Sequence, residues 1–271
     1  MKITIIGTGN IGSAIALGLA KGSMFAASDI TCTDMSEKAL DNVRRADYDF
    51  VLSMDNITAV RDADIIILAV KPWKVESVIN EIKTAIDYEK QIVVSIAAGV
   101  TFEDLASYFV KGCVSYLANC DDIEPAIFRV IPNTAIAVCS SMTFISAYNA
   151  SDEQSALVLR IFRELGNAML VEERLMAAGT SLASSGIAFA LRYIRAAIEG
   201  GVELGFYPQE AQSIVINTVQ GAIDLLIENN SNPEAEIDKV TTPGGITIRG
   251  LNEMEVSGFT ASVIRGLKAS R

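Results

Sequence analysis

Short apolar segments alternate with amphipathic or polar segments over the first half of the chain. This pattern predicts strands at residues 3–6, 30–33, 49–52, 64–70, 91–96, 127–131 and 142–147. Helical periodicity between them predicts helices at residues 11–21, 37–45, 74–86 and 102–109, with a helical turn at 56–61. Strands that alternate with helices form a mostly parallel sheet with helices on its faces, and such sheets bind ligands at the carboxyl ends of their strands.

From about residue 150 the pattern is helical almost to the end. Ser151 and Gln154 form a capping box before a helix at 152–165, and a brief strand is expected at 168–171. Longer helices follow at 186–204 and 208–228. We therefore predict an α/β fold in two domains, a Rossmann-type doubly wound sheet in residues 1–150 and an all-helical domain in residues 151–271.

The helix that begins at Gly186 is apolar on most of its circumference. A helix that is hydrophobic all round is a buried one, and a small helical domain cannot easily cover it alone. A dimer interface would cover it, so we expect the helical domain to make the protein a homodimer or a higher homo-oligomer. An ordinary core helix is the alternative.

The first strand runs directly into a glycine-rich turn with Gly7, Gly9 and Gly12 at the spacing GxGxxG. In dinucleotide-binding proteins the first glycine permits the tight turn, the second lets the backbone approach the pyrophosphate, and the third allows close helix packing. The free N–H groups and the dipole of the following helix favour the anion. We therefore predict a dinucleotide-binding loop, with a purely structural turn as the alternative; its residues are Gly7, Thr8, Gly9, Asn10, Ile11 and Gly12.

Asp34 lies at the end of the second predicted strand and bears on the choice of dinucleotide. A carboxylate at this position accepts hydrogen bonds from the ribose hydroxyls of NAD and repels the 2′-phosphate of NADP, for which an arginine is usual. No arginine directly follows it, which favours NADH. Ser36 and Lys38 could still hold a phosphate, so NADPH stays open. The structural alternative for Asp34, a helix N-cap, belongs more naturally to Ser36.

The formal net charge of −11 argues against nucleic acid or an anionic membrane as a partner, because both require clustered Lys and Arg. The longest apolar run in the predicted sheet, residues 65–70, is far too short to span a bilayer. The chain begins with a strand, so no cleavable leader is expected. These features predict a cytoplasmic protein without a membrane or nucleic-acid partner.

The chain contains no histidine, and its four cysteines form no CxxC pair. Zinc or another metal and a disulfide framework are therefore not expected. The missing histidine also counts against a 2-hydroxy-acid dehydrogenase, because these enzymes usually take the hydroxyl proton with a histidine base. A lysine could replace that base, so this class is weakened rather than excluded.

A second glycine-containing motif, Thr-Pro-Gly-Gly-Ile-Thr at residues 242–247, lies near the end of the chain. Successive N–H groups and a hydroxyl at the start of a helix suit a small carboxylate or phosphate. As a pattern alone, a capped loop is equally consistent with this segment.

Several segments together make the chain resemble the pyrroline-5-carboxylate reductase family. They occur in the order and spacing of that family, at residues 7–12, 69–72, 94–100, 129–134, 185–189 and 242–247. The likeness covers essentially the whole chain, and the segment at 242–247 is its most specific part. It implies an NAD(P)-binding domain, a helical dimerisation domain and a site between subunits.

The resemblance also implies a reaction: hydride passes from the nicotinamide to the C=N carbon of 1-pyrroline-5-carboxylate, a small cyclic imine carboxylate, and gives proline. A protonated imine needs no strong protein base, which suits a chain without histidine. The implied additional cofactor-binding residues are Asn56, Ala69, Val70, Lys71, Pro72, Ala97, Ala98 and Gly99. The implied substrate-binding residues are Thr242, Gly244, Gly245, Ile246 and Thr247, with the Thr247 hydroxyl near the imine nitrogen as a hydrogen-bond partner or proton relay.

The chain departs from the family pattern in its substrate half. The segment from Ala183 to Phe189 lacks the proline, where Ile187 stands, and one glycine of the family motif Ser-Gly-Ser-Gly-Pro-Ala-Tyr/Phe. Arg195 stands where glutamate is typical, and an insert spans residues Gly112 to Glu124. Two alternatives therefore stay open. One is a reductase of another cyclic imine or a lysine-based hydroxy-acid dehydrogenase, and the other is a non-catalytic dinucleotide-binding regulatory protein.

Overall fold

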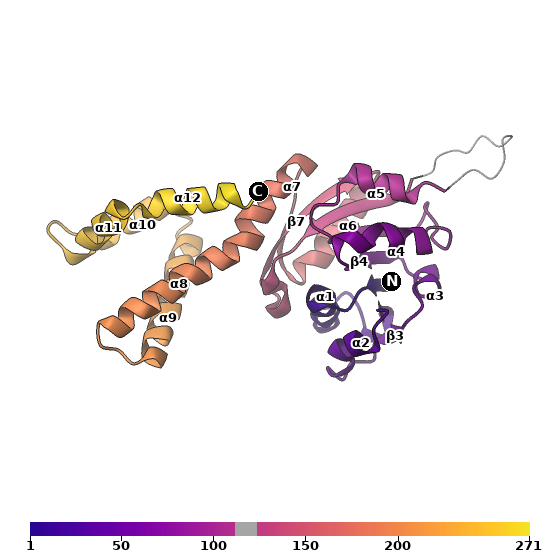
Figure 1. Ribbon diagram of the computed structural model, residues 1–271, viewed down its shortest axis with the longest axis horizontal. Coiled ribbons are helices and arrows are strands. Elements are labelled where there is room, and N and C mark those ends of the chain that lie inside the picture. Colours follow the sequence, from indigo (N-terminus) through magenta and orange to yellow (C-terminus); the bar gives the residue numbers. More distant parts are fainter. Residues whose placement is uncertain (112–123) are drawn as a thin grey trace. The chain divides into compact units, whose positions relative to one another are not determined.

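The computed structural model describes residues 1–111 and 124–271, so all of the Gly112–Glu124 insert except Glu124 lies outside the described residues. The chain forms two compact units, Met1–Ser184 and Ser185–Arg271 (Figure 1).

The described part of the first unit contains an eight-stranded sheet with the strand order β3-β2-β1-β4-β5-β6-β7-β8. Its strands are β1 (Ile3–Ile6), β2 (Ile30–Thr33), β3 (Val51–Ser53), β4 (Ile65–Leu68), β5 (Ile92–Ser95), β6 (Ala126–Ile131), β7 (Ser141–Tyr148) and β8 (Gly166–Leu170). Neighbouring strands are parallel except for β6 and β7, which are antiparallel. From β1 the chain builds outward to β3 and then returns to β4 on the other side of β1. The sheet therefore has its topological switch point between β1 and β4, where open α/β sheets bind ligands.

Helices cover both faces of this sheet, as the fully buried strands β1, β4 and β5 require. The core on one face contains side chains of α1 (Asn10–Lys21), α2 (Glu37–Arg44) and α6 (Asp152–Arg163). The core on the other face contains side chains of α3 (Asn56–Arg61), α4 (Val75–Ile82) and α5 (Phe102–Phe109). The predicted helix at 74–86 is shorter than expected, because a 3-10 turn, Pro72–Lys74, precedes α4 and the helix ends at Ile82.

The first unit extends beyond the predicted boundary near residue 150. The capping box at Ser151 does start α6, and its side chain accepts a hydrogen bond from the Gln154 N–H. However, α6 returns the chain to the sheet as β8, which pairs with β7 in parallel. Gly166 begins β8 with φ +134°, and a Cβ there would lie 2.3 Å from backbone atoms of Ser141. The segment after residue 150 thus completes the sheet before the helical unit begins.

The second unit is helical, as predicted. A short helix α7 (Met176–Gly179) and a π-helical segment, Thr180–Ser185, lead into it. Its helices are α8 (Gly186–Glu203), α9 (Pro208–Glu228), α10 (Pro233–Val240), α11 (Ile246–Val256) and α12 (Phe259–Ala269). Within this unit α8 packs against α9, and α11 packs against α12.

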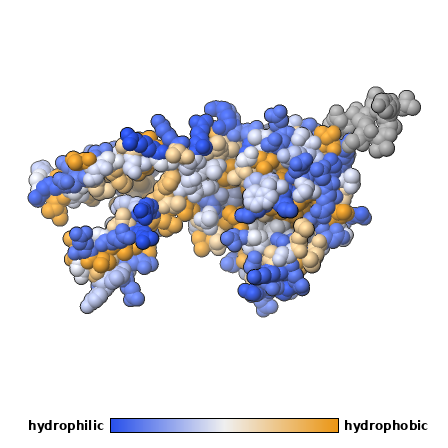
Figure 2. Space-filling view, in the orientation of Figure 1, coloured by the Kyte–Doolittle hydropathy of each residue, from blue (hydrophilic) through white to orange (hydrophobic). Residues whose placement is uncertain are grey.

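The second unit has almost no core of its own in the single chain. Ala211 is its one buried residue, and α8 contains none. Large apolar side chains are exposed instead, including Leu204 at 84%, Val256 at 84% and Leu191 at 58%. Figure 2 shows hydrophobic residues on the visible surface of these helices. The apolar helix predicted to be buried is therefore not covered within its own unit.

Candidate functional site

The glycine turn after β1 has the geometry that its sequence predicts. Gly7 has φ +101°, and its N–H donates to the Thr33 carbonyl oxygen at 2.7 Å. A Cβ on Gly7 would lie 2.7 Å from the Ala69 carbonyl oxygen, and one on Gly12 would lie 1.9 Å from the Gly7 carbonyl oxygen. Both positions therefore require glycine for close backbone packing, Gly7 against the end of β4 and Gly12 against the turn itself.

Gly9 differs from the other two glycines because the space beside it is open. It precedes α1, and a Cβ built on it would meet no atom within 4 Å. The first backbone bond of the helix is made by the Ser13 N–H to the Gly9 carbonyl oxygen at 2.9 Å, so the N–H groups of Asn10, Ile11 and Gly12 precede it. Free N–H groups at a helix N-terminus beside open space fit a pyrophosphate.

Asp34 connects the end of β2 to the glycine turn. One carboxylate oxygen accepts hydrogen bonds from the Thr8 N–H at 2.9 Å and the Thr8 hydroxyl at 3.3 Å, and the other accepts one from the Ser36 N–H at 2.9 Å. The Thr8 carbonyl oxygen also accepts a bond from Asn42 at 3.0 Å, and Thr8 is fully buried. The side chain of Thr8, predicted to bind the cofactor, is thus directed into the protein, where it holds the loop.

Asn56, another predicted cofactor residue, is also turned inward. It is 6% exposed, and its amide oxygen accepts a bond from the Thr33 hydroxyl at 2.6 Å. Its amide nitrogen lies 3.3 and 3.2 Å from the two carboxylate oxygens of Glu81. Asn56 therefore joins the end of β2 to α4.

The remaining predicted cofactor residues follow β4 and β5, which lie next to β1 in the sheet. The Ala69 N–H donates to the Ile6 carbonyl oxygen at 2.8 Å, which places Ala69 and Val70 against the turn. Lys71 and Pro72 continue this loop, and the Lys71 side chain is exposed. The residues after β5 are the buried Ala97, the exposed Ala98 and Gly99, which has φ +85°. The structure thus brings the loops after β1, β4 and β5 to one edge of the sheet.

The predicted substrate loop lies in the second unit, at the start of α11. The Gly245 N–H donates to the Thr242 carbonyl oxygen at 2.9 Å and closes a turn, in which Gly244 has φ +69°. A Cβ on Gly245 would lie 2.6 Å from the Thr242 hydroxyl oxygen. Ile246 and Thr247 are exposed in the first turn of the helix. The predicted cofactor-binding residues therefore all lie in the first unit, and the predicted substrate-binding residues all lie in the second.

A partly buried ion pair within the first unit was not predicted. Arg129 on β6 is 8% exposed, and its guanidinium donates to the Glu173 carboxylate at 2.5 Å. The same carboxylate oxygen accepts a bond from the Phe102 N–H, at the start of α5, at 2.8 Å. The signal was present in the sequence, because an arginine inside the apolar run 126–131 must find an anionic partner when buried.

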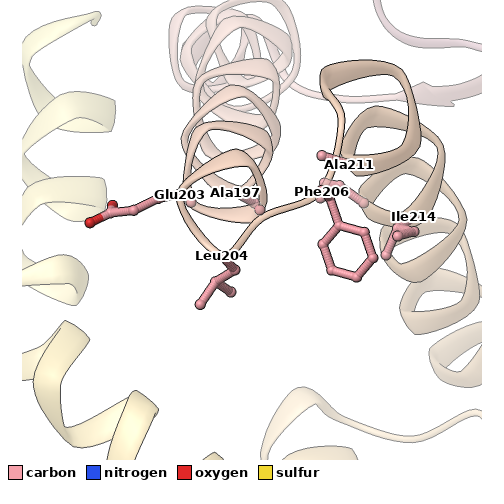
Figure 3. Close-up of a pocket in the computed structure, with 9 residues that line it drawn as sticks. Ala197, Glu203, Leu204, Phe206, Ala211 and Ile214 are labelled. Atoms are coloured by element: carbon pink, nitrogen blue, oxygen red, sulfur yellow. The ribbon is translucent and has the colours of Figure 1, made fainter.

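A hollow in the second unit lies where α8 turns into α9 (Figure 3). Leu204, Phe206 and Ile214 contribute apolar side chains to it, and Glu203 is its charged lining residue. Small-molecule sites need several convergent polar groups. The hollow belongs to the exposed apolar surface of this unit rather than to the predicted sites.

Within residues 1–111 and 124–271, no group of three or more Cys, Asp or Glu side chains could hold a metal ion. No helix in the described ranges is long and apolar enough to cross a membrane.

The fold and the glycine turn together define a Rossmann-type dinucleotide-binding protein with a helical second unit. Comparison with protein families gives two matches: the model described as pyrroline-5-carboxylate reductase dimerisation covers residues 173–271, and the one described as NADP oxidoreductase, coenzyme F420-dependent, covers residues 2–99. The chain belongs to the pyrroline-5-carboxylate reductase family, which confirms the resemblance in its sequence and its predicted fold class.

Individual relatives support this assignment over the full chain. Pyrroline-5-carboxylate reductase of Methanosarcina acetivorans is 34% identical over 275 residues, which cover 100% of this chain and 97% of that protein. Pyrroline-5-carboxylate reductase 1 of Dictyostelium discoideum is 35% identical over 99% of this chain, which spans about half (48%) of that longer protein. The crystal structure of Plasmodium falciparum pyrroline carboxylate reductase with NADP bound has a TM-score of 0.86 at 24% identity and covers 100% of this chain and 95% of that one, which shows the shared fold.

Proposed function

We propose that the protein reduces 1-pyrroline-5-carboxylate to proline with NADH or NADPH. Full-length similarity to pyrroline-5-carboxylate reductases is the observation that carries this proposal. The residues present fit a dinucleotide, because the helix N-terminus at Asn10 faces open space beside Gly9. When bound, the reduced nicotinamide supplies a hydride to the imine carbon.

The roles of the protein groups follow from their chemistry. The first N–H groups of α1 bind the pyrophosphate, and the loops after β4 and β5 line the remainder of the cofactor. The turn Thr242–Gly245 and the first N–H groups of α11 bind the substrate carboxylate. The Thr247 hydroxyl, exposed in that first turn, donates to or accepts from the imine nitrogen. No histidine is available as a base, so the protein acts by positioning a substrate that arrives protonated.

We further propose that NADH is preferred over NADPH. Asp34 keeps a carboxylate at the end of β2, and a 2′-phosphate placed there would meet a like charge. The hydrogen bonds that the Asp34 carboxylate accepts from Thr8 and Ser36 leave an acceptor position for a ribose hydroxyl. They do not remove the negative charge of the carboxylate.

The function is tested by following the oxidation of NADH and NADPH with 1-pyrroline-5-carboxylate as substrate. Turnover with proline as product is expected. A panel of other cyclic imines and of 3-hydroxy acids tests the alternative substrates. Binding of a dinucleotide without turnover of any imine would overturn the proposed reaction and favour a regulatory protein.

A further inference from the structure

Two methionines are unusually exposed beside Asp34. Met35 is 81% exposed and Met54 is 59% exposed. They follow β2 and β3, which are neighbours in the sheet with Thr33 paired to Ser53. The Asp34 N–H also donates to the Ser53 carbonyl oxygen at 3.4 Å, so the two strand ends are joined just before the methionines.

This exposure has no explanation within the fold. The buried apolar residues of the first unit form three clusters, and neither methionine is a member of them. Exposed apolar side chains that gather at one place mark a binding surface. Methionine is flexible and polarizable, and its sulfur makes favourable contacts with aromatic rings.

The position of the two methionines relative to the glycine turn indicates which aromatic ring they would contact. A dinucleotide whose pyrophosphate lies at the start of α1 and whose ribose reaches Asp34 carries its base on that same ribose. The base is therefore the group within reach of residues that flank Asp34. We propose that the side chains of Met35 and Met54 form an apolar surface that contacts the adenine ring of the cofactor. This inference rests on the dinucleotide binding in the proposed function.

The test uses ligands that differ in their adenosine part. Trp73 is the only tryptophan, is 75% exposed and follows β4, so quenching of its emission by the reduced nicotinamide, which absorbs in that range, reports binding. Dissociation constants are measured for NADH, or for NADPH if it binds more tightly, and for reduced nicotinamide mononucleotide, which lacks the adenosine. Inhibition by ADP-ribose, which keeps the adenosine and lacks the nicotinamide, is measured in parallel.

The variants are Met35→Ala, Met54→Ala, their combination, and Met35→Leu as the apolar replacement. Met169→Ala is the matched control, because Met169 is 43% exposed on β8, at the opposite edge of the sheet. We expect the double variant to bind the dinucleotide and ADP-ribose about tenfold more weakly, on the scale of two sulfur–ring contacts, with the mononucleotide unchanged. Met35→Leu should retain most of the affinity, because leucine keeps an apolar side chain of similar volume.

Unchanged affinity for the dinucleotide in the double variant would overturn the inference, and so would a parallel loss for the mononucleotide. Neither result would affect the proposed reaction, which is judged by turnover of the wild-type protein. Failure of the wild-type protein to bind either dinucleotide would instead overturn the proposed function together with this inference.

Discussion

The carboxylate of Asp34 accepts hydrogen bonds from both the backbone N–H and the hydroxyl of Thr8, at 2.9 and 3.3 Å. With the Ser36 N–H on the other oxygen, about three of its four acceptor positions are occupied. Asp34 therefore does two things at once. It holds the glycine loop against β2, and it keeps a negative charge and one acceptor position where the adenosine ribose is expected.

Asp34→Ser should narrow or reverse a preference for NADH. Removing the carboxylate removes a like-charge repulsion of about 1–3 kcal/mol toward the 2′-phosphate, on the order of tenfold or more in affinity. The measurement is kcat/KM with each cofactor. Asp49→Ser is the control, because it makes the same charge change at an exposed residue away from the loop. A wild-type protein that strongly prefers NADPH would contradict the assignment.

Gly9→Ala and Gly12→Ala should have different effects. A Cβ at Gly9 meets nothing within 4 Å, so the variant should keep its thermal stability and lose dinucleotide affinity, because the methyl group occupies the space expected for the pyrophosphate. A Cβ at Gly12 would lie 1.9 Å from the Gly7 carbonyl oxygen, so that variant should lose stability as well. Thermal unfolding and fluorescence titration distinguish the two. Normal binding by a folded Gly9→Ala variant would argue against a pyrophosphate at this turn.

Gly245→Val should abolish imine reduction and leave dinucleotide binding near normal. A Cβ on residue 245 would lie 2.6 Å from the Thr242 hydroxyl oxygen. The valine side chain would therefore displace this hydroxyl and distort the turn that is proposed to bind the substrate carboxylate. The variant is assayed for turnover and for NADH binding in the same preparation. Full activity would require the anion-site assignment to be withdrawn.

Thr247→Val keeps the shape of the side chain and removes the hydroxyl. If that hydroxyl assists the transition state, kcat/KM should fall by roughly 1–3 kcal/mol, with the fold unchanged. Thr260→Val removes an exposed hydroxyl on α12 that bonds to Glu255, and serves as the control. Retention of full kcat/KM would show that Thr247 has no chemical role.

Leu191→Arg should dissociate or unfold the assembly. Leu191 is 58% exposed on α8 in the single chain, and a partner that covers this helix would bury an unpaired charge. Light scattering of the wild-type protein should give at least a dimer, and the variant should have a lower mass. A wild-type protein that is a stable monomer at micromolar concentration would remove the interface argument.

The Cys32 thiol should resist alkylation in the folded protein. Burial raises its pKa to about 12, so almost no thiolate exists near pH 8, and the side chain is inaccessible. Mass spectrometry after iodoacetamide treatment should find Cys32 unmodified until the protein is unfolded. Rapid labelling under native conditions would contradict the packing of β2.

The order of strands and helices could be predicted because the apolar segments are short, distinct and bounded by turns. The glycine turn could be predicted in detail, since its backbone geometry excludes side chains at Gly7 and Gly12. The inward hydrogen bonds of Thr8 and Asn56 could not, because a polar side chain beside a ligand loop can face either way. The end of the first unit was also missed, because β8 pairs with β7 through contacts that no local pattern encodes.

All eight strands of the described sheet lie before Ser184, at the end of the first unit. Every strand pairing described here is made within the first unit, so exchange of the chain beyond this point leaves the sheet intact. If Asp34 sets the coenzyme preference and the exposed face of α8 makes the subunit contact, a hybrid gene joined after residue 184 would take its coenzyme preference from one parent and its subunit contact from the other. The two properties can then diverge independently among descendants of a common ancestor.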